Sequence, residues 1–344
     1  MSLLTSWLRI GSPTSSKADS CPCASHDSLT IVEKADILQS QPAEKRQEKV
    51  QLLVQSIVNT HAELLELPHL RPSPTINRLL GGLVAICSEI HDQEIVNQVL
   101  CNVSVQAVLP SLRTICAASE SCLELHWAEH ILEGSNAEEV QDRLKTFPYY
   151  DNYEELTRLE LCSILSATKT SPRKVAFIGS GPLPLTSLCL LRALKHDAYI
   201  KTLTSQGNEQ EKVVVLNVDY DEAAISASLR LSIALGEAGR GMEFICAEAT
   251  SASDKKDLAE FDVVYMAALV GVTQAEKEKI MLEVVGRMRK GALLVVRSSW
   301  GLRTCLYPEV DLATENLLEA LEPCVVVHPY GQVVNSVMVA RVRG

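Results

Sequence analysis

A glycine-rich run in this 344-residue sequence has the composition of a ligand-binding turn. The run Gly179-Ser-Gly181-Pro-Leu-Pro184 directly follows the apolar segment Val175–Ile178. Glycines at these positions let the backbone approach a ligand closely and leave the amide groups of the next helix pointing at it. Pro184 replaces the third glycine of the dinucleotide-binding pattern, and prolines cannot supply the amide donors that a diphosphate requires. The run therefore favours a ligand that carries no phosphate.

Two acidic residues follow the next two predicted strands. Asp219 comes at the end of Val213–Val218, where a carboxylate can accept hydrogen bonds from both hydroxyls of a ribose. Glu248 follows Met242–Cys246 and is placed to reach an adenine amine or a neighbouring water. A glycine turn and two acids in this order indicate S-adenosylmethionine more than any other nucleoside ligand. The alternative is that the glycines only form a tight turn and that Asp219 and Asp221 cap the next helix.

A cluster of tyrosines lies just before the glycine-rich run. Three of the eight tyrosines fall in Phe147-Pro-Tyr149-Tyr150-Asp-Asn-Tyr153, although only 4% of the residues are aromatic. A helix is predicted to follow, from Glu154 to about Lys169. If it packs antiparallel to the first strand, its start lies over the carboxyl ends of the strands, where the ligand must sit. We expect the tyrosines to form a lid wall on the cofactor, or alternatively to pack a junction between domains.

Two glutamates flank the apolar seam of a long predicted helix. Glu120 and Glu124 lie one turn apart, and Trp127 and Ile131 continue the same flank. Carboxylates beside a seam are usually solvated. A carboxylate that instead faces a cleft between a helical domain and a sheet can act as a base, particularly if partial burial raises its pKa.

The first half of the chain is predicted to be all-helical. Apolar residues recur there at three- and four-residue steps, and prolines mark several helix ends. The main helical segments are Ala43–Leu67, Ser73–His91 and Val103–Leu132. We expect residues 28–168 to form an N-terminal helical domain. Residues 1–27, rich in Ser, Thr and Pro, are expected to form a disordered tail.

After Pro172, short apolar runs alternate with helix-length segments, which indicates a mainly parallel sheet covered by helices on both faces. The strand candidates are Val175–Ile178, Val213–Val218, Met242–Cys246, Val263–Met266, Leu293–Val296, Cys324–Val327 and Ser336–Val342. The helices between them are Leu183–Leu194, Glu222–Leu235, Gln274–Met288 and Leu312–Leu321. Only a hairpin fits between the last two strands. We therefore predict an α/β fold in which residues 169–344 form a Rossmann-like class I S-adenosylmethionine-dependent transferase domain.

Composition narrows the class of protein further. The formal net charge is −11 and the charges are spread along the chain, so nucleic acid and anionic membranes are not expected as partners. No apolar stretch approaches the length of a membrane span and no signal peptide is recognisable, so we expect a cytosolic protein. The eleven cysteines are then expected to be free thiols. Cys21 and Cys23 lack a second ligand pair nearby, so we expect no metal site.

Several runs closely resemble the nicotianamine synthase family over about residues 45–342. The most specific run is Lys174-Val-Ala-Phe-Ile-Gly-Ser-Gly-Pro-Leu-Pro-Leu-Thr186, and the tyrosine cluster also matches. Further matches are Leu123-Glu-Leu-His126, Asp262-Val-Val-Tyr-Met-Ala-Ala-Leu-Val-Gly271, Arg297-Ser-Ser-Trp-Gly-Leu-Arg303, Leu306-Tyr-Pro308 and Asn335-Ser-Val337. Two positions differ from the family pattern, because plant members usually carry a histidine at Trp300 and an aspartate at Glu248.

The resemblance implies an enzyme that joins three S-adenosylmethionine molecules through their 3-amino-3-carboxypropyl groups. Methylthioadenosine leaves each time, an azetidine ring closes, and the chemistry needs no metal. By resemblance, Glu124 is the base that deprotonates the attacking amine, and Tyr150 positions that amine. The cofactor-binding residues implied are Tyr149, Gly179, Ser180, Gly181, Thr186, Asp219, Glu248 and Ala267. Arg297 or Arg303 is expected to bind the acceptor carboxylate.

Two other classes of protein are compatible with the same fold. One is a small-molecule methyltransferase, which would expose the sulfonium methyl group to an acceptor instead of the γ-carbon. The other is a regulator that binds S-adenosylmethionine without turnover. The products formed from S-adenosylmethionine alone distinguish all three.

Overall fold

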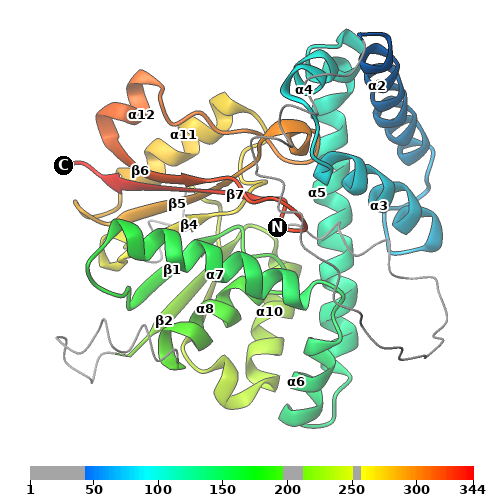
Figure 1. Cartoon of the computed structure of the whole chain (residues 1–344). Helices are drawn as coiled ribbons and strands as arrows, with labels where there is room; N and C mark the ends of the chain where they lie inside the picture. The colour runs from blue at the N-terminus through cyan, green and yellow to red at the C-terminus, as the bar shows by residue number, and fades with distance from the viewer. Residues whose placement is uncertain (1–42, 197–211, 251–256) are drawn as a thin grey trace, which may run out of the picture.

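The computed structural model describes residues 43–196, 212–250 and 257–344 (Figure 1). Within them lies a seven-stranded sheet in the order β3-β2-β1-β4-β5-β7-β6. The predicted tail at residues 1–27, with Cys21 and Cys23, lies outside the described residues. The strands are β1 (Lys174–Ile178), β2 (Val214–Asp219), β3 (Met242–Cys246), β4 (Val263–Met266), β5 (Leu293–Ser298), β6 (Leu321–Val327) and β7 (Ser336–Val342).

The strand directions confirm the predicted α/β class and the final hairpin. β1 to β5 pair in parallel, β1 lying between β2 and β4. β7 runs antiparallel to both β5 and β6, with Ser298 opposite Ser336 at the β5 edge. β7 therefore lies between β5 and β6, and it follows β6 directly in the chain as the second strand of the predicted hairpin.

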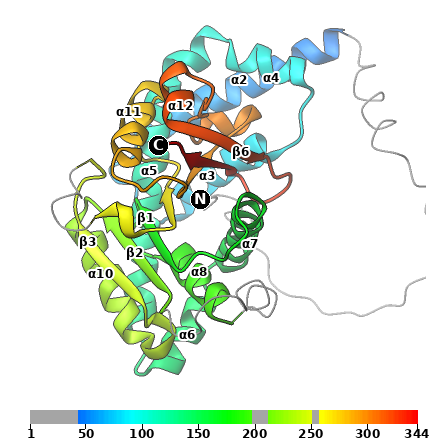
Figure 2. The same cartoon turned by 90° about the vertical axis from the view of Figure 1, so that its left-hand side faces the viewer.

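Alternating side chains of β1 show how the sheet divides the core. Val175 and Phe177 pack into one hydrophobic cluster with residues of α7 (Tyr150–Ala167) and α8 (Leu185–His196). Ala176 and Ile178 pack into another with residues of α11 (Gln274–Val285) and α12 (Glu315–Ala320). This period of two is the strand geometry expected when helices cover both faces of a sheet (Figure 2). The domain boundary expected at residue 168 falls between α7 and β1.

The remaining helices pack around α5 (Val103–Leu132), which runs beside the sheet (Figure 1). Its apolar seam shares a core with α2 and with α10. These helices are α2 (Ala43–Leu65), α3 (Pro74–Ser88), α4 (Gln93–Leu100), α6 (Ala137–Lys145) and α10 (Glu222–Ala234). α4 and α6 were not predicted, because each is only two to three turns long. Their polar N-caps are Asp92 and Asn136.

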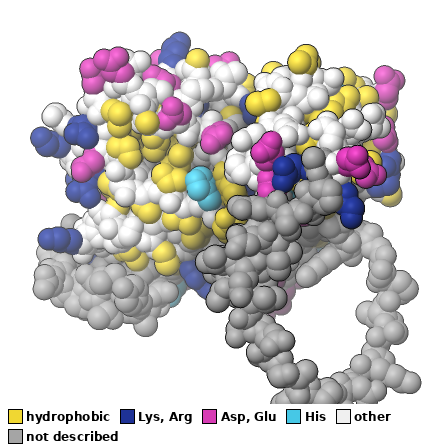
Figure 3. All heavy atoms as spheres, turned by 45° about the horizontal axis from the view of Figure 1, so that its top comes forward, with side chains coloured by type: hydrophobic (Ala, Val, Ile, Leu, Met, Phe, Trp, Pro, Cys, Tyr) yellow, Lys and Arg dark blue, Asp and Glu magenta, His cyan; other side chains and the backbone are white. Residues whose placement is uncertain are grey.

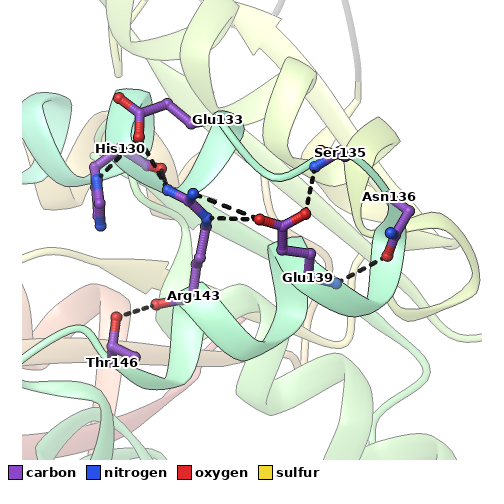
Figure 4. Close-up of polar contacts among 7 residues, drawn as sticks. All are labelled: His130, Glu133, Ser135, Asn136, Glu139, Arg143 and Thr146. Carbon is purple, nitrogen blue, oxygen red and sulfur yellow. Dashed lines mark hydrogen bonds and ion pairs between the residues drawn. The ribbon is translucent and has the colours of Figure 1, made fainter.

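A polar network at the corner between α5 and α6 turns the chain back along α5 (Figure 4). Arg143 donates to the carboxylate of Glu133 at 2.9 Å and to the carbonyl of His130 at 3.0 Å. Glu139 accepts from the amide of Ser135 at 3.0 Å. The return brings the tyrosine cluster alongside α5, where the rings of Phe147 and Trp127 meet edge to face with centroids 5.4 Å apart.

α7 begins at Tyr150, four residues before the predicted start at Glu154. The backbone amide of Tyr153 already donates to the carbonyl of Tyr149 at 3.0 Å, so the tyrosine cluster forms the first helical turn. Tyr153 therefore belongs to a helix and not to a loop, and the helix sets the direction of its side chain.

Charged side chains of both signs are intermixed on the face shown in Figure 3. Among the described residues, no single helix is both long and apolar enough to cross a membrane. One bent pair of helices, α4 with α5, meets the length and composition criteria only when the two are taken together.

Candidate active site

A cavity of about 320 Å³ lies at the carboxyl ends of β1, β2 and β4, closed on one side by α5. This is the edge at which parallel α/β sheets bind ligands. Seven of the residues that the resemblance implies as catalytic or cofactor-binding line it: Glu124, Gly179, Ser180, Gly181, Asp219, Glu248 and Ala267. The fold thus brings together residues separated by up to 143 positions in the chain.

Two positions of the turn after β1 require glycine. Gly179 and Gly181 have φ angles of +79° and +69°, which disfavour any side chain. A Cβ on Gly179 would also lie 2.6 Å from a methyl group of Val270. A Cβ on Gly181 would overlap the carboxylate of Glu124. The backbone of Gly181 therefore lies in direct contact with the proposed base.

Asp219 holds the glycine turn in place. One carboxylate oxygen accepts from the amide of Gly181 at 2.8 Å and the other from the amide of Asp221 at 3.0 Å. Burial raises the pKa of Asp219, and the backbone hydrogen bonds act in the opposite direction. Asp221, not Asp219, caps the following helix by accepting from the amide of Ala223 at 2.9 Å. Of the two aspartates that the sequence offered as helix caps, only Asp221 therefore caps the helix.

Glu124 is a buried carboxylate at the wall of the cavity. Glu124 is only 5% exposed, and its carboxylate accepts a hydrogen bond of 2.7 Å from the hydroxyl of Tyr153. Burial raises the pKa of Glu124 to about 8; the hydrogen bond from Tyr153 lowers it, and the nearby Glu120 raises it further. A carboxylate with such a pKa can exchange a proton near neutral pH.

Glu120 has an equivalent arrangement one turn away. Its residue is 8% exposed, and its carboxylate accepts a hydrogen bond from the hydroxyl of Tyr307. Burial raises the pKa of Glu120 to about 7. Because both glutamates are buried, their interpretation as solvated helix residues is wrong. Tyr307 was in one of the runs that resemble the family, but nothing in its local sequence indicated that it contacts α5.

The charge of the cavity suits a cation. Five acidic residues line it and, among the described residues of its lining, none is Lys, Arg or His. A cationic ligand would therefore meet acidic side chains, and no basic one, among the described residues of the lining. The five acidic residues are Glu120, Glu124, Asp219, Asp221 and Glu248.

Tyr149 and Tyr150 lie outside this cavity. Tyr149 is buried, and its ring packs against Phe147 with centroids 5.2 Å apart. The hydroxyl of Tyr150 accepts a hydrogen bond of 3.0 Å from Arg192, at a second cavity between α8 and α6. The structure therefore brings Tyr153, rather than Tyr150, to the carboxylate of Glu124.

The two arginines expected at the acceptor carboxylate make other contacts. Arg297 is fully buried and forms a bidentate pair with Glu160, with N–O distances of 2.6 and 3.1 Å. It also donates to the hydroxyl of Thr186 at 2.8 Å, so Thr186 too lies away from the cavity lining.

Arg303 also makes contacts outside the cavity. The expectation that Arg297 or Arg303 faces the cavity is therefore wrong. It is 2% exposed, donates to the carbonyls of Ser88 and Gly331 at 3.2 and 3.3 Å, and lies 5.3 Å from the ring centroid of Trp300. Trp300, one of the departures from the family pattern, thus packs on an arginine and not in the cavity.

Comparison with known proteins identifies the family. The family model described as nicotianamine synthase protein matches residues 46–344. Nicotianamine synthase 2 of rice is 33% identical over 87% of this chain and 85% of its own length. Nicotianamine synthase 2 of Arabidopsis thaliana is 32% identical over 85% of this chain and 84% of its own length.

A solved structure shows the same fold. The crystal structure of MtNAS in complex with MTA and tNA superimposes with a TM-score of 0.65 at 20% identity, covering 89% of this chain and 100% of that one. The match of nearly the whole chain to one family model, together with relatives above 30% identity, settles the assignment. The chain belongs to the nicotianamine synthase family.

Proposed function

We propose that this chain is a nicotianamine synthase that condenses three S-adenosylmethionine molecules by 3-amino-3-carboxypropyl transfer. The observation that carries the proposal is the buried carboxylate of Glu124, which lies against Gly181 of the nucleoside-binding turn and accepts from Tyr153. An aminocarboxypropyl transfer needs a base at that position, beside the sulfonium end of the nucleoside.

Each condensation is a nucleophilic substitution that balances without a redox partner. In two of the three substitutions the α-amine of one molecule forms a bond to the γ-carbon of another, and in the third an amine attacks the γ-carbon of its own chain and closes the azetidine ring. Each time the γ-carbon–sulfur bond breaks. The electron pair of that bond goes to sulfur, and methylthioadenosine leaves as a neutral thioether. The attacking amine loses one proton for each bond formed, and Glu124 accepts it.

The raised pKa of Glu124 suits this task. At neutral pH the empty site holds much of Glu124 in the neutral form, since its pKa is about 8. A cationic substrate in the cavity favours the carboxylate form, because an adjacent positive charge stabilises it. Binding of the substrate therefore generates the base, and the hydroxyl of Tyr153 holds its carboxylate in place.

The remaining cavity residues serve the nucleoside. Asp219 accepts from the ribose hydroxyls with the lone pairs that the backbone amides leave free, and Glu248 reaches the adenine. Gly179 and Gly181 let the backbone approach the nucleoside, and Ser180 and Ala267 line the same wall. We therefore assign substrate binding to these residues and proton transfer to Glu124.

The alternative is a small-molecule methyltransferase on the same fold. Incubation of the purified protein with S-adenosylmethionine alone, read by mass spectrometry, separates the two. A nicotianamine synthase forms methylthioadenosine and nicotianamine. A methyltransferase forms S-adenosylhomocysteine once an acceptor is added, and a non-catalytic regulator gives neither product.

We also place this activity in the cytosol and in metal homeostasis, through the chelating product. The support is the composition and the family, not a site seen in the fold. S-adenosylmethionine enters as a substrate, the reaction written above needs no metal, and the partners proposed are small molecules and neither nucleic acid nor membrane.

A further inference from the structure

The aminocarboxypropyl group carries an α-carboxylate, yet the described lining of the cavity contains no cationic side chain. Arg297 and Arg303 are both committed to other contacts. A carboxylate bound there must therefore be met by neutral donors, such as backbone amides and hydroxyl groups. The turn that follows β4 supplies such donors.

A buried lysine lies behind this turn. Lys277 of α11 is fully buried, and its ammonium group donates to the carbonyls of Ala268 at 2.8 Å and Ala267 at 3.3 Å. No ion pair of Lys277 occurs within the described residues. Burial lowers the pKa of Lys277 to about 7. Ala267 and Ala268 line the cavity, whereas Lys277 does not, so the lysine holds the turn from the side away from the ligand.

The contacts of Lys277 show where the neighbouring amides point, and the carbonyl of Ala267 also accepts from the amide of Val270 at 3.2 Å. In a trans peptide, the N–H group points opposite to the C=O group of the same unit. Since the carbonyls of Ala267 and Ala268 point at Lys277, the amides of Ala268 and Leu269 point away from it, on the cavity side. Neither amide donates to an acceptor within the part of the chain that the structure describes.

A hydroxyl group lies on the adjoining turn. Ser180 lines the same cavity, is 5% exposed, and its Oγ has no hydrogen-bond partner among the described residues. The two turns are in contact, because the space beside Gly179 is filled by Val270 and Ala267. Two unpaired amides and one unpaired hydroxyl therefore belong to adjoining turns that line one cavity.

We propose that the amides of Ala268 and Leu269, with the hydroxyl of Ser180, bind the α-carboxylate of the S-adenosylmethionine whose nucleoside lies at Asp219. Lys277 is the positioning residue that turns the two amides toward it. The inference rests on the proposed function for the identity of the ligand. It assigns the carboxylate to backbone donors instead of the arginines expected from the sequence.

The test compares three ligands that share the nucleoside and differ in the groups on sulfur; methylthioadenosine, a neutral thioether, also lacks the sulfonium charge. S-adenosylmethionine carries the carboxylate, decarboxylated S-adenosylmethionine lacks it, and methylthioadenosine lacks the whole amino acid chain. Equilibrium binding is measured by calorimetry on full-length protein in a Glu124→Gln background, so that turnover does not consume the ligand. Lys277→Met should weaken S-adenosylmethionine about 10- to 100-fold, the usual cost of losing hydrogen bonds to a charged group. The other two ligands should bind as before.

Lys279→Met, on the exposed side of the same helix, is the matched control and should change none of the three affinities. Ser180→Ala should show the same selectivity as Lys277→Met, and it decides the question if the lysine variant does not fold. An equal loss for all three ligands, or no loss for S-adenosylmethionine, overturns the proposal. Failure of the wild-type protein to form nicotianamine would instead refute the proposed function, because this comparison needs no turnover.

Discussion

The hydroxyl of Tyr153 donates a 2.7 Å hydrogen bond to a carboxylate oxygen of Glu124, and both side chains are buried. The two residues come from different helices, α7 and α5. The other carboxylate oxygen of Glu124 lies over Gly181. The pair thus joins the helical layer to the glycine turn after β1.

Replacing Glu124 by Gln should lower turnover without disturbing substrate binding. The amide has nearly the same shape but cannot accept a proton, so nicotianamine formation should fall about 10²- to 10⁴-fold. Every condensation step needs a neutral amine, and intermediates should therefore not accumulate. Product formation and S-adenosylmethionine affinity are measured on one preparation. Glu129→Gln, exposed on the same helix, is the control, and normal turnover in Glu124→Gln would move the base to Glu120.

Tyr153→Phe should shift the pH dependence of the reaction upward. The hydroxyl of Tyr153 lowers the pKa of Glu124, so its removal raises that pKa and leaves less base at neutral pH. We expect the rising limb of kcat/KM to move up by about one unit, or roughly a tenfold loss at pH 7 that recovers at higher pH.

Tyr150→Phe is the informative comparison, because the resemblance assigned the role to Tyr150 whereas the hydrogen bond comes from Tyr153. If Tyr150→Phe shifts the profile and Tyr153→Phe does not, the contact seen here is not the functional one.

Glu124 and Glu120 should make the protein less stable as pH rises. Their pKa values are raised to about 8 and about 7 in the native state, whereas an unfolded glutamate titrates near about 4.3. Between these values the native state binds protons that the unfolded chain has lost, so the free energy of unfolding falls with increasing pH. The loss is complete only above the native pKa values.

Urea unfolding between about pH 5 and pH 9 measures this slope. A loss of several kcal/mol is expected from the two groups together, since each unit of pKa difference contributes about 1.4 kcal/mol. Glu124→Gln cannot titrate and should lose less stability over the same range. An identical slope in the wild type and the variant would contradict the raised pKa.

Gly181→Ala should abolish function for a reason that Gly291→Ala does not share. Both glycines have positive φ angles, +69° and +83°, so each alanine should cost about 1–2 kcal/mol of stability. A Cβ at Gly291 meets nothing within 4 Å, whereas at Gly181 it overlaps Glu124. Only Gly181→Ala should lose turnover. Thermal unfolding and product formation measured on both variants check this, and equal activity would remove the contact from the mechanism.

Asp219→Ala should weaken binding of S-adenosylmethionine and methylthioadenosine alike. Both ligands carry the ribose, and the loss should be about 2–3 kcal/mol, the cost of leaving hydroxyl groups without a charged acceptor. Calorimetry with both ligands measures it, and Asp142→Ala on the exposed face of α6 serves as the control. Unchanged affinity would remove Asp219 from the site, and a loss confined to S-adenosylmethionine would contradict its assignment to the ribose.

The strands and the sheet edge that carries the cavity were predictable because their signals are local. Short, mostly apolar runs of four to seven residues mark the strands. The turn after β1 has positive φ angles at two positions, and the sequence places glycine at both. Asp219 could be placed from its strand alone, since the carboxyl ends of parallel strands share one edge of the sheet.

The sequence alone thus determined the α/β class, the order of the strands and the family. Only the tertiary structure decided which side chains meet. Arg297 pairs with Glu160 across 137 residues, and Tyr307 contacts Glu120 across 187. Periodicity and turn chemistry act within a few residues, so they specify helices and strands. The partner of a buried charge is instead set by how those elements pack, where a low dielectric makes an unpaired charge costly.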